Sequence, residues 1–372
     1  MGDSHRIANS CAVIALAVAA AGVVATLSVQ DGKLSALVHM SEEEPLASLA
    51  RDADPGFRFV HRESHYDGVY FYAIARDPFA TGAEHELIDA AAYRYGHAGY
   101  GWLAWLASAG HAAAVPAALL GVGLAGVAVA GYAASRLAHE LGWSAWGGLV
   151  VALSPGLMYA ITADTSEPVA MAATALALLA WFRRRWLRAA VALVAACLIK
   201  EPLLLLPAGL GIWEALRYVR GNRPPDLIKR AAVILAGPFA FGAWAIYLRS
   251  VFGTWPFSHP SEEFLVFPFS GWWDTLRRAA SMAAGPFESS QLGNASVGLL
   301  VVTGAVLLIG MIRAGRFRSE LDPFFLMYAL LVFSLNWLGL LYPKDLIRET
   351  TIPLALAPAV IATVRARISG QG

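Results

Sequence analysis

The 372-residue sequence has little charge and almost no cysteine. Charged residues make up 15% of it, whereas an ordinary soluble domain carries roughly a quarter. Its two cysteines, Cys11 and Cys197, both fall within apolar runs, so neither a disulfide framework nor a cysteine-based zinc site is expected. Because 58% of the residues are hydrophobic, the chain is instead predicted to be an integral membrane protein.

Several common catalytic motifs are also missing. The sequence has no P-loop, no GxGxxG in a strand–helix context, no HExxH and no GxSxG. Its histidines, His65 and His97 among them, show no metal-ligand spacing. The sequence therefore favours neither ATP-driven transport nor a serine or zinc hydrolase. It predicts no metal site and no nucleic-acid partner.

Long apolar runs are what the sequence has in abundance. A helix needs ~20 apolar residues to cross ~30 Å of hydrocarbon. Runs near this length lie at residues 11–29, 113–137, 144–162, 166–182, 229–248, 297–312 and 323–342. Shorter runs lie at residues 189–199, 202–218 and 351–364. We predict an all-α, polytopic membrane helix bundle of about ten transmembrane segments, built as one domain over residues 1–372. The first run is longer than a signal-peptide core and is interpreted as a retained anchor.

Basic residues indicate how these segments are oriented. The stretch 188–220 is interrupted at Lys200 and Glu201, and reading it as two segments puts Arg183 and Arg217 on the same side of the membrane. Short cytoplasmic loops carry an excess of Lys and Arg, so this side is predicted to be cytoplasmic, together with the N-terminus. A single span would instead place Lys200 and Glu201 in lipid, at a cost of roughly 2.5 to 3.5 kcal/mol each.

Two long segments lie outside in this topology, residues 30–112 and 250–296. The first is too aromatic for a disordered linker, and its stretches 69–75 and 100–106 are predicted to form interfacial helices with apolar faces on the membrane. The second segment contains several Trp and Phe residues. Because Trp favours the headgroup level, this segment is predicted to lie along the outer membrane surface.

Ionisable residues near the outer face are costly unless they are paired or functional, so each is a candidate. They are Asp67, Asp77, Arg94, Asp164, Glu167, Lys200, Glu201, Lys344, Asp345, Arg348 and Glu349. Asp67 follows Tyr66 and precedes Tyr70 and Tyr72. It suits a general base, and the tyrosines offer stacking faces and hydroxyls to a sugar ring. The alternative is an Asp-Gly turn in a solvated loop.

Two further acidic or basic motifs each allow two interpretations. Arg94, between Tyr93 and Tyr95, either binds an anionic headgroup or pairs with Asp89. Asp164, on the turn that leads to Glu167, is either a helix N-cap or a second carboxylate facing the base across a cavity.

Lys200 and Arg348 are the remaining candidate cations. Each could supply positive charge to a departing phosphate. Alternatively, Lys200 pairs with neighbouring acids and Arg348 anchors the last helix at the interface. Asp67 is thus the candidate catalytic residue. The candidate binding residues are Tyr66, Tyr70, Tyr72, Arg94, Tyr95, Asp164, Glu167, Lys200, Glu201 and Arg348.

The order of these motifs resembles a known family. The run from Tyr66 to Pro78, followed by Asp89 to Tyr95, looks like the first outer loop of bacterial GT-C glycosyltransferases. The segments Asp164 to Pro168, Leu198 to Glu201 and Arg348-Glu349 fall where that group also carries polar motifs. The chain departs from the family pattern at His97 to Gly101, where many relatives have an Arg-x-Leu-Tyr-Pro type sequence. The resemblance covers most of the chain in layout, but in motif only these short segments.

The resemblance implies a mannosyltransferase-like enzyme of the bacterial cytoplasmic membrane, with its active site facing outward. Such an enzyme moves a sugar from a polyprenyl-phosphate donor to a hydroxyl of a glycan or lipid acceptor, with inversion, in cell-surface glycan or glycolipid synthesis. Asp67 matches the family's catalytic base. Arg94, Lys200 or Arg348 would stabilise the phosphate that leaves. No cofactor is required, and a divalent metal is not obligatory.

Two other classes compete with this hypothesis. A lipid or sugar transporter or flippase would also have about ten helices and charged residues near the membrane midplane. A scaffold without catalytic activity would use its loops to bind a partner enzyme. Asp67→Asn separates these classes, because a transferase would lose its product while folding normally, whereas a scaffold would tolerate the change.

Overall fold

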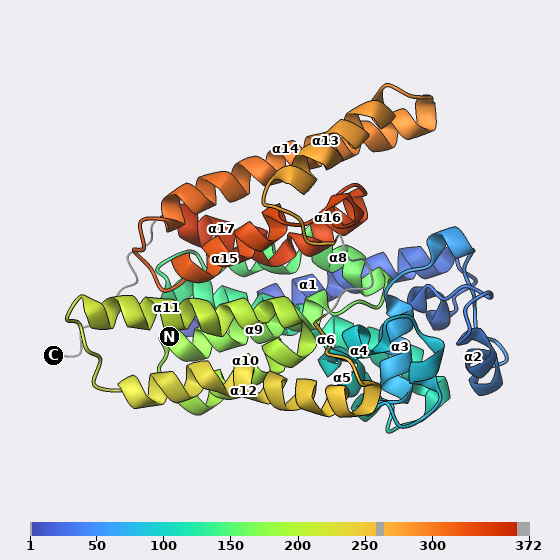
Figure 1. The fold of residues 1–372 in the computed structure, drawn as a ribbon, viewed down its shortest axis with the longest axis horizontal. Coiled ribbons are helices and arrows are strands. Elements are labelled where there is room, and N and C mark those ends of the chain that lie inside the picture. Colours follow the sequence, from blue (N-terminus) through green and yellow to red (C-terminus); the bar gives the residue numbers. More distant parts are fainter. Residues whose placement is uncertain (1, 258–263, 363–372) are drawn as a thin grey trace.

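The computed structural model describes residues 2–257 and 264–362. Within these ranges the chain is helical, with no named strand and two isolated bridges. The prediction of an all-α fold is therefore confirmed for this part of the chain. Figure 1 shows an elongated bundle, with the first loop region gathered at one end of the long helices.

Four helices are long and apolar enough to cross a membrane. They are α1 (Gly2–Ser28), α6 (Val115–Glu140), α12 (Leu227–Phe252) and α14 (Phe287–Ala314). Shorter apolar helices pack among them, namely α9 (Glu167–Phe182), α10 (Trp186–Ile199), α15 (Asp322–Phe333) and α17 (Thr351–Ile361). Helix α11 (Leu205–Val219) lies between α10 and α12 in the chain. The described chain is thus compatible with a helical membrane protein.

Two of the predicted spans are interrupted helices. The run 144–162 forms α7 (Gly147–Ala152) and α8 (Pro155–Thr162). Pro155 disfavours a helical conformation at the residue before it, which ends α7. The run 323–342 leaves the helix after Phe333, because Asn336 caps a short 3-10 turn, η6 (Trp337–Gly339), by accepting a hydrogen bond from Leu338 N. Helix α16 (Pro343–Glu349) follows.

Residues 29–114 cover one end of the bundle, here called the loop end. They form η1 (Leu34–Val38), α2 (Ala47–Ala53), η2 (Arg62–Ser64), α3 (Gly68–Arg76), η3 (Glu84–Leu87), α4 (Ala91–Tyr95), α5 (Gly99–Ala107) and η4 (Ala112–Ala114). The helices predicted at 69–75 and 100–106 are present as α3 and α5. Helix α3 is not a surface helix, however, because residues 68–75 are all buried against the neighbouring elements.

The second long segment forms a helix that pairs with the start of α14, and its position along the outer membrane surface stays a prediction. Helix α13 (Ser270–Ala283) packs against the first half of α14, and Figure 1 shows this pair projecting together from the bundle. Gly293 of α14 permits the approach, since a Cβ there would lie 2.3 Å from Ala283 N. Residues 258–263 of the predicted segment lie outside the described residues.

Differences in helix length create a recess at the loop end. At about 1.5 Å per residue, α6 is ~39 Å long and α9 ~24 Å. The two helices end level at the other end, called the opposite end, where Arg183 Nη2 lies 2.6 Å from Glu140 Oε1. Helix α9 therefore begins about 15 Å below the loop end of α6. Gly126 allows this crossing, because a Cβ there would lie 2.9 Å from the Pro168 and Val169 backbone.

Candidate functional site

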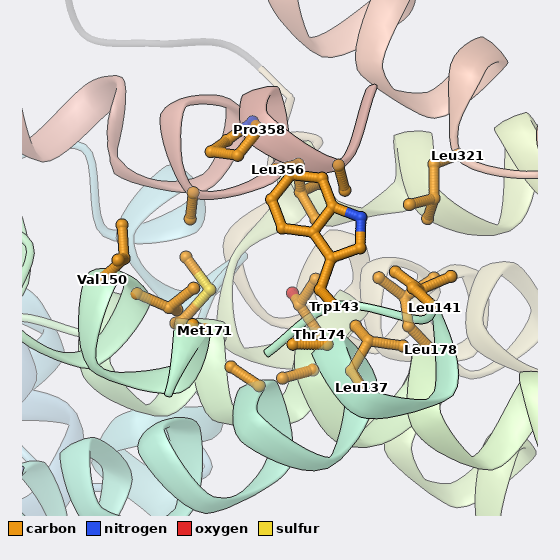
Figure 2. A pocket seen from close by; sticks show the side chains of 17 residues that line it. Leu137, Leu141, Trp143, Val150, Met171, Thr174, Leu178, Leu321, Leu356 and Pro358 are labelled. Carbon is orange, nitrogen blue, oxygen red and sulfur yellow. The ribbon is translucent and has the colours of Figure 1, made fainter. Parts of the chain in front are cut away.

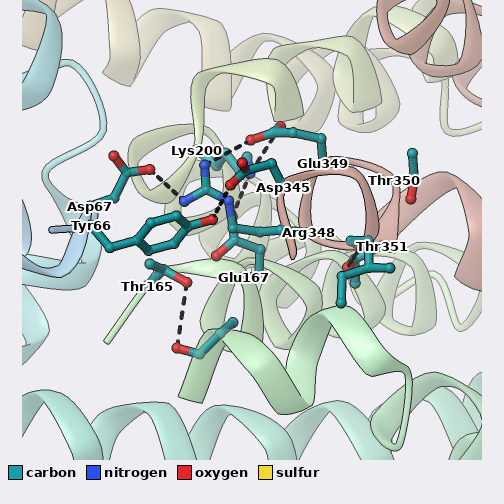
Figure 3. Close-up of polar contacts among 12 residues, drawn as sticks. Tyr66, Asp67, Thr165, Glu167, Lys200, Asp345, Arg348, Glu349, Thr350 and Thr351 are labelled. Atoms are coloured by element: carbon teal, nitrogen blue, oxygen red, sulfur yellow. Dashed lines mark hydrogen bonds and ion pairs between the residues drawn. The ribbon is translucent and has the colours of Figure 1, made fainter. Parts of the chain in front are cut away.

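A cavity of about 310 Å³ opens in the recess where α9 begins. Its walls come from the loop before α3, from α4 and from the segments around residues 166, 200 and 345. Ionisable side chains dominate the lining: Asp67, Arg94, His97, Glu167, Lys200, Glu201, Asp345, Arg348 and Glu349. We call this space the polar cavity. Figure 3 shows several of these side chains converging from separate ribbons.

Asp67 directly precedes α3, and close packing fixes its backbone. A Cβ on the next residue, Gly68, would lie 2.6 Å from Val38 O and 2.7 Å from Ala163 O, so the chain passes closely between two other segments. Asp67 Oδ2 accepts a hydrogen bond from Arg348 Nη1, and its Oδ1 lies 3.5 Å from Arg94 Nη1. Burial alone would raise the pKa of Asp67, but the Arg348 and Arg94 guanidinium groups hold it well below its usual range.

Tyr66 joins the first loop region to α16. Its hydroxyl donates to Asp345 Oδ1 at 2.5 Å. Lys344 Nζ lies 4.6 Å and Arg348 Cζ 4.9 Å from the centre of the Tyr66 ring, and the ring meets Tyr159 edge-on at 5.5 Å. Cations near an aromatic face are attracted by its quadrupole. These contacts fix the ring and aim its hydroxyl at Asp345 (Figure 3).

Arg94 is held in place by an aromatic ring. Its guanidinium lies 3.5 Å from the centre of the Tyr70 ring, and its Nε donates to Asp89 Oδ1 at 3.1 Å. Its side chain is 13% exposed. The pairing with Asp89 and the position in the cavity coexist, so the two interpretations given to Arg94 from the sequence are both compatible with this geometry.

Lys200 and Arg348 share their acidic partners. Lys200 Nζ lies 2.7 Å from Glu167 Oε1 and 3.7 Å from Glu349 Oε2. Arg348 Nε lies 3.7 Å from Glu167 Oε1, and its Nη2 donates to Glu349 Oε1 at 3.2 Å. Glu167 is the first residue of α9, where an acidic side chain also meets the positive end of the helix dipole. The result is one connected network across α9, the end of α10 and α16.

His97 and Glu201 form a further pair on the cavity wall. His97 Nδ1 lies 3.0 Å from Glu201 Oε2. Burial alone would raise the pKa of Glu201, but the neighbouring His97 brings it below its usual value. Tyr93 stacks edge-on against the His97 ring at 5.2 Å, so the pair is held from the α4 side.

The lining is richer in acids than in cations. Five carboxyl groups (Asp67, Glu167, Glu201, Asp345 and Glu349) face three Lys or Arg side chains (Arg94, Lys200 and Arg348). Within residues 2–257 and 264–362, no three His, Cys, Asp or Glu side chains are grouped so as to hold a metal ion. The lining offers cations that can contact an anion and carboxylates that can accept a proton.

The structure brings seven of the predicted site residues to the polar cavity: Tyr66, Asp67, Arg94, Glu167, Lys200, Glu201 and Arg348. Tyr70 lies behind the wall and supports Arg94. Tyr72 and Tyr95 point into the core, where Tyr72 accepts a hydrogen bond from Arg76 and Tyr95 donates to Asp77 O. Neither offers a stacking face to a ligand in the cavity.

Asp164 also lies away from the cavity lining. It is 1% exposed, adopts a positive φ of 46°, and neither carboxylate oxygen has a hydrogen-bond partner within the described residues. Burial raises the pKa of this carboxyl well above its usual value. The side-chain N-cap role considered for it is not adopted, because Ser166 precedes α9 directly and no side chain caps that helix.

Among the acidic, basic and histidine residues of the lining, His97, Asp345 and Glu349 were not predicted as site residues, although Asp345 and Glu349 were among the ionisable candidates near the outer face. His97 follows Arg94 by three residues, and Asp345 precedes Arg348 by three. Residues three or four apart on a helix lie on one face. Pro343 marks the start of a short helix, so this spacing was the available signal for Asp345.

A second cavity, of about 120 Å³, lies toward the opposite end of the bundle, where α6 ends and α7 begins. Figure 2 shows its lining of apolar side chains from α6, α9 and α17, with Trp143 and Met171 among them. Thr174 provides one of its few polar atoms. Glu167 of the polar cavity and Met171, Thr174 and Leu178 of this apolar cavity are spaced along one face of α9. The two cavities thus follow each other along the same helix face.

No protein-family model matches the sequence, and no curated protein matches it.

Proposed function

We propose that the protein is a membrane glycosyltransferase of the GT-C type, which moves a sugar from a polyprenyl-phosphate donor to a hydroxyl of a glycan or lipid acceptor. The observation that carries this proposal is the succession of a charged cavity and an apolar cavity along one face of α9. A ligand with an anionic headgroup and a long apolar chain matches both. The reaction class further rests on the resemblance of the first loop region to that family.

The topology we propose places the loop end outside the bacterial cytoplasmic membrane. Ten segments would cross it: α1, α6, α7 with α8, α9, α10, α11, α12, α14, α15 and α17. Basic residues at the opposite end, such as Arg183 and Arg217, support a cytoplasmic location for that end. The polar cavity then opens outward, and the donor enters it from the outer leaflet.

In this reaction an acceptor hydroxyl attacks the anomeric carbon and the lipid phosphate leaves. Arg348, Arg94 and Lys200 are positioned to stabilise the negative charge on the departing phosphate, an electrostatic effect that is strong in a cavity poor in water. Guanidinium groups also match phosphate oxygens in a bidentate manner. A carboxylate of the cavity accepts the proton of the acceptor hydroxyl, and the sequence assigns that role to Asp67. Displacement in line inverts the anomeric centre.

A transfer assay tests the proposal. Purified protein is incubated with radiolabelled polyprenyl-phosphate sugars and a membrane extract, and the labelled product is quantified. We expect a product with the unmodified protein and a fall in kcat of roughly 10²- to 10³-fold for Arg348→Gln, because a donor to the leaving phosphate is lost. The matched control is Arg62→Gln, which alters an exposed pair with Glu43 and should keep full activity. Absence of labelled product with every common donor would contradict the proposal.

A transporter of lipid-linked sugars is the second candidate. The interrupted segments α7–α8 and α15–η6 favour it, because broken helices near the binding site are typical of secondary transporters. The same material separates the two classes. A transporter in vesicles moves the labelled lipid across the bilayer without forming a product, whereas a transferase forms the product in detergent.

A further inference from the structure

Asp67 is poorly placed to accept a proton. Arg348 donates to its Oδ2, and Arg94 lies against its Oδ1, so a cation already faces each oxygen. The Asp67 side chain is 32% exposed, which leaves it accessible, but its interactions stabilise the charged form. A general base works best when its pKa lies near the working pH, and these guanidinium groups hold the pKa of Asp67 far below it.

Asp345 has the features that Asp67 lacks. It lines the same cavity, and its Oδ1 accepts the Tyr66 hydroxyl at 2.5 Å. In the described part of the chain no hydrogen bond reaches its Oδ2, which is left to receive a proton. Burial raises the pKa of Asp345 above its usual value, despite the lowering effect of Arg348 and Tyr66. In Figure 3 its carboxyl lies on the far side of the Tyr66 hydroxyl from Asp67.

Asp345 is also held rigidly. Lys344 and Arg348 of the same short helix face the Tyr66 ring, and Tyr159 of α8 packs on its edge. The charged and titratable groups around Asp345, on its own helix and on the elements packed against it, are Tyr66, Asp67, Tyr159, Lys344 and Arg348. A fixed orientation lowers the cost of placing a base against an acceptor hydroxyl.

From this geometry we infer that Asp345, and not Asp67, takes the proton of the acceptor hydroxyl, while Asp67 is a positioning residue for Arg348 and Arg94. This inference rests on the proposed function. In the step, the acceptor oxygen forms a bond to the anomeric carbon and its proton passes to Asp345 Oδ2. The bond between that carbon and the phosphate oxygen breaks, and its electron pair leaves on the phosphate between the two guanidinium groups.

The test compares Asp345→Asn with Asp67→Asn in the full-length protein, with kcat, donor KM and direct donor binding measured for each. Asp345→Asn should lower kcat by roughly 10²- to 10⁴-fold while donor binding stays within threefold of the unmodified protein. Asp67→Asn should chiefly weaken donor binding, because the two guanidinium groups lose their common partner. Asp31→Asn, an exposed carboxyl paired with Arg58, is the matched control and should change neither quantity.

Tyr66→Phe gives a second test that does not remove a charge. The Tyr66 hydroxyl stabilises the Asp345 carboxylate, so its loss raises the pKa of Asp345. A base is active when deprotonated, and activity is lost as the pH falls through its pKa. The acid limb of the kcat profile should therefore move to higher pH in Tyr66→Phe and should disappear in Asp345→Asn.

Two results distinguish failure of this inference from failure of the proposed function. If the unmodified protein forms product and Asp345→Asn keeps a kcat within threefold of it, the inference is wrong and the transferase stands. The inference is wrong in the same way if Asp67→Asn loses kcat and its acid limb with donor binding unchanged. If the unmodified protein transfers no sugar from any common donor, the proposed function fails and the inference falls with it.

Discussion

Two buried charge clusters lie at the two ends of the helix pair α9 and α10, and they differ in what surrounds them. At the opposite end, Arg230 donates to Glu214 at 2.7 Å and to Asp226 at 3.0 Å. Its guanidinium lies 5.2 and 5.1 Å from the ring centres of Trp181 and Trp186. At the loop end, the charges of Asp67, Glu167, Lys200, Arg348 and their neighbours surround an open cavity of about 310 Å³.

The comparison shows that paired charges alone do not indicate a site. The opposite-end cluster lines neither of the two cavities described above, and aromatic rings cover its guanidinium, so its geometry fits a role in joining α9, α10, α11 and α12. The loop-end cluster combines similar pairs with space for a ligand. Perturbed ionisable groups that line a cavity are the better candidates for function. The predictions below test this division of roles.

The largest effect should follow from breaking the opposite-end cluster. Arg230→Ala leaves Glu214, whose side chain is 5% exposed, without its closest cation. Removing one partner of a buried ion pair costs roughly 3 to 5 kcal/mol. The melting temperature of the purified protein, measured by heating it in detergent, should fall accordingly. The fraction that remains folded should keep its kcat, and a selective loss of kcat would contradict the division.

A smaller effect is expected where α6 crosses the start of α9. Gly126→Ala places a Cβ 2.9 Å from the Pro168 and Val169 backbone, and overpacking of this kind costs roughly 1 to 3 kcal/mol. It should also displace Glu167 and weaken donor binding. The matched control is Gly121→Ala on the same helix, where a Cβ meets nothing within 4 Å. Equal behaviour of the two variants would show that the close approach has no role.

The smallest effect concerns the pH dependence of stability. The pKa of Asp67 is depressed in the folded protein, so its contribution to the free energy of unfolding is present above its unfolded pKa of about 3.9 and is lost as the pH falls through the folded pKa. The difference in melting temperature between the unmodified protein and Asp67→Asn should stay constant from about pH 5 to 8 and narrow below about pH 4. A difference that widens on acidification would contradict the assigned direction.

The long helices were predictable because apolar length alone specifies them. The runs 113–137 and 229–248 correspond to α6 and α12. The breaks within 144–162 and 323–342 were harder, because apolar composition continues across them. There a proline and a capping asparagine override it at Pro155 and Asn336.

The candidate site was predictable in part for a related reason. Asp67 lies between α1 and α6, Lys200 between α10 and α11, and Arg348 between α15 and α17, and the alternation of segments puts these connections at one end of the bundle. The sequence did not predict in which direction each side chain points. Tyr72 and Tyr95 belong to the predicted aromatic motifs, yet both point into the core, because residues 68–75 of α3 are all buried and α4 buries Tyr95.

The position of a bound donor headgroup tests the account most directly. An electron cryomicroscopy structure of the protein with a polyprenyl-phosphate sugar should place the phosphate in the polar cavity, in contact with Arg348 and with Arg94 or Lys200. The lipid chain should follow α9 past Met171 toward Leu178. A phosphate bound elsewhere, with the polar cavity empty in the same reconstruction, would contradict the assignment of this cavity as the donor site.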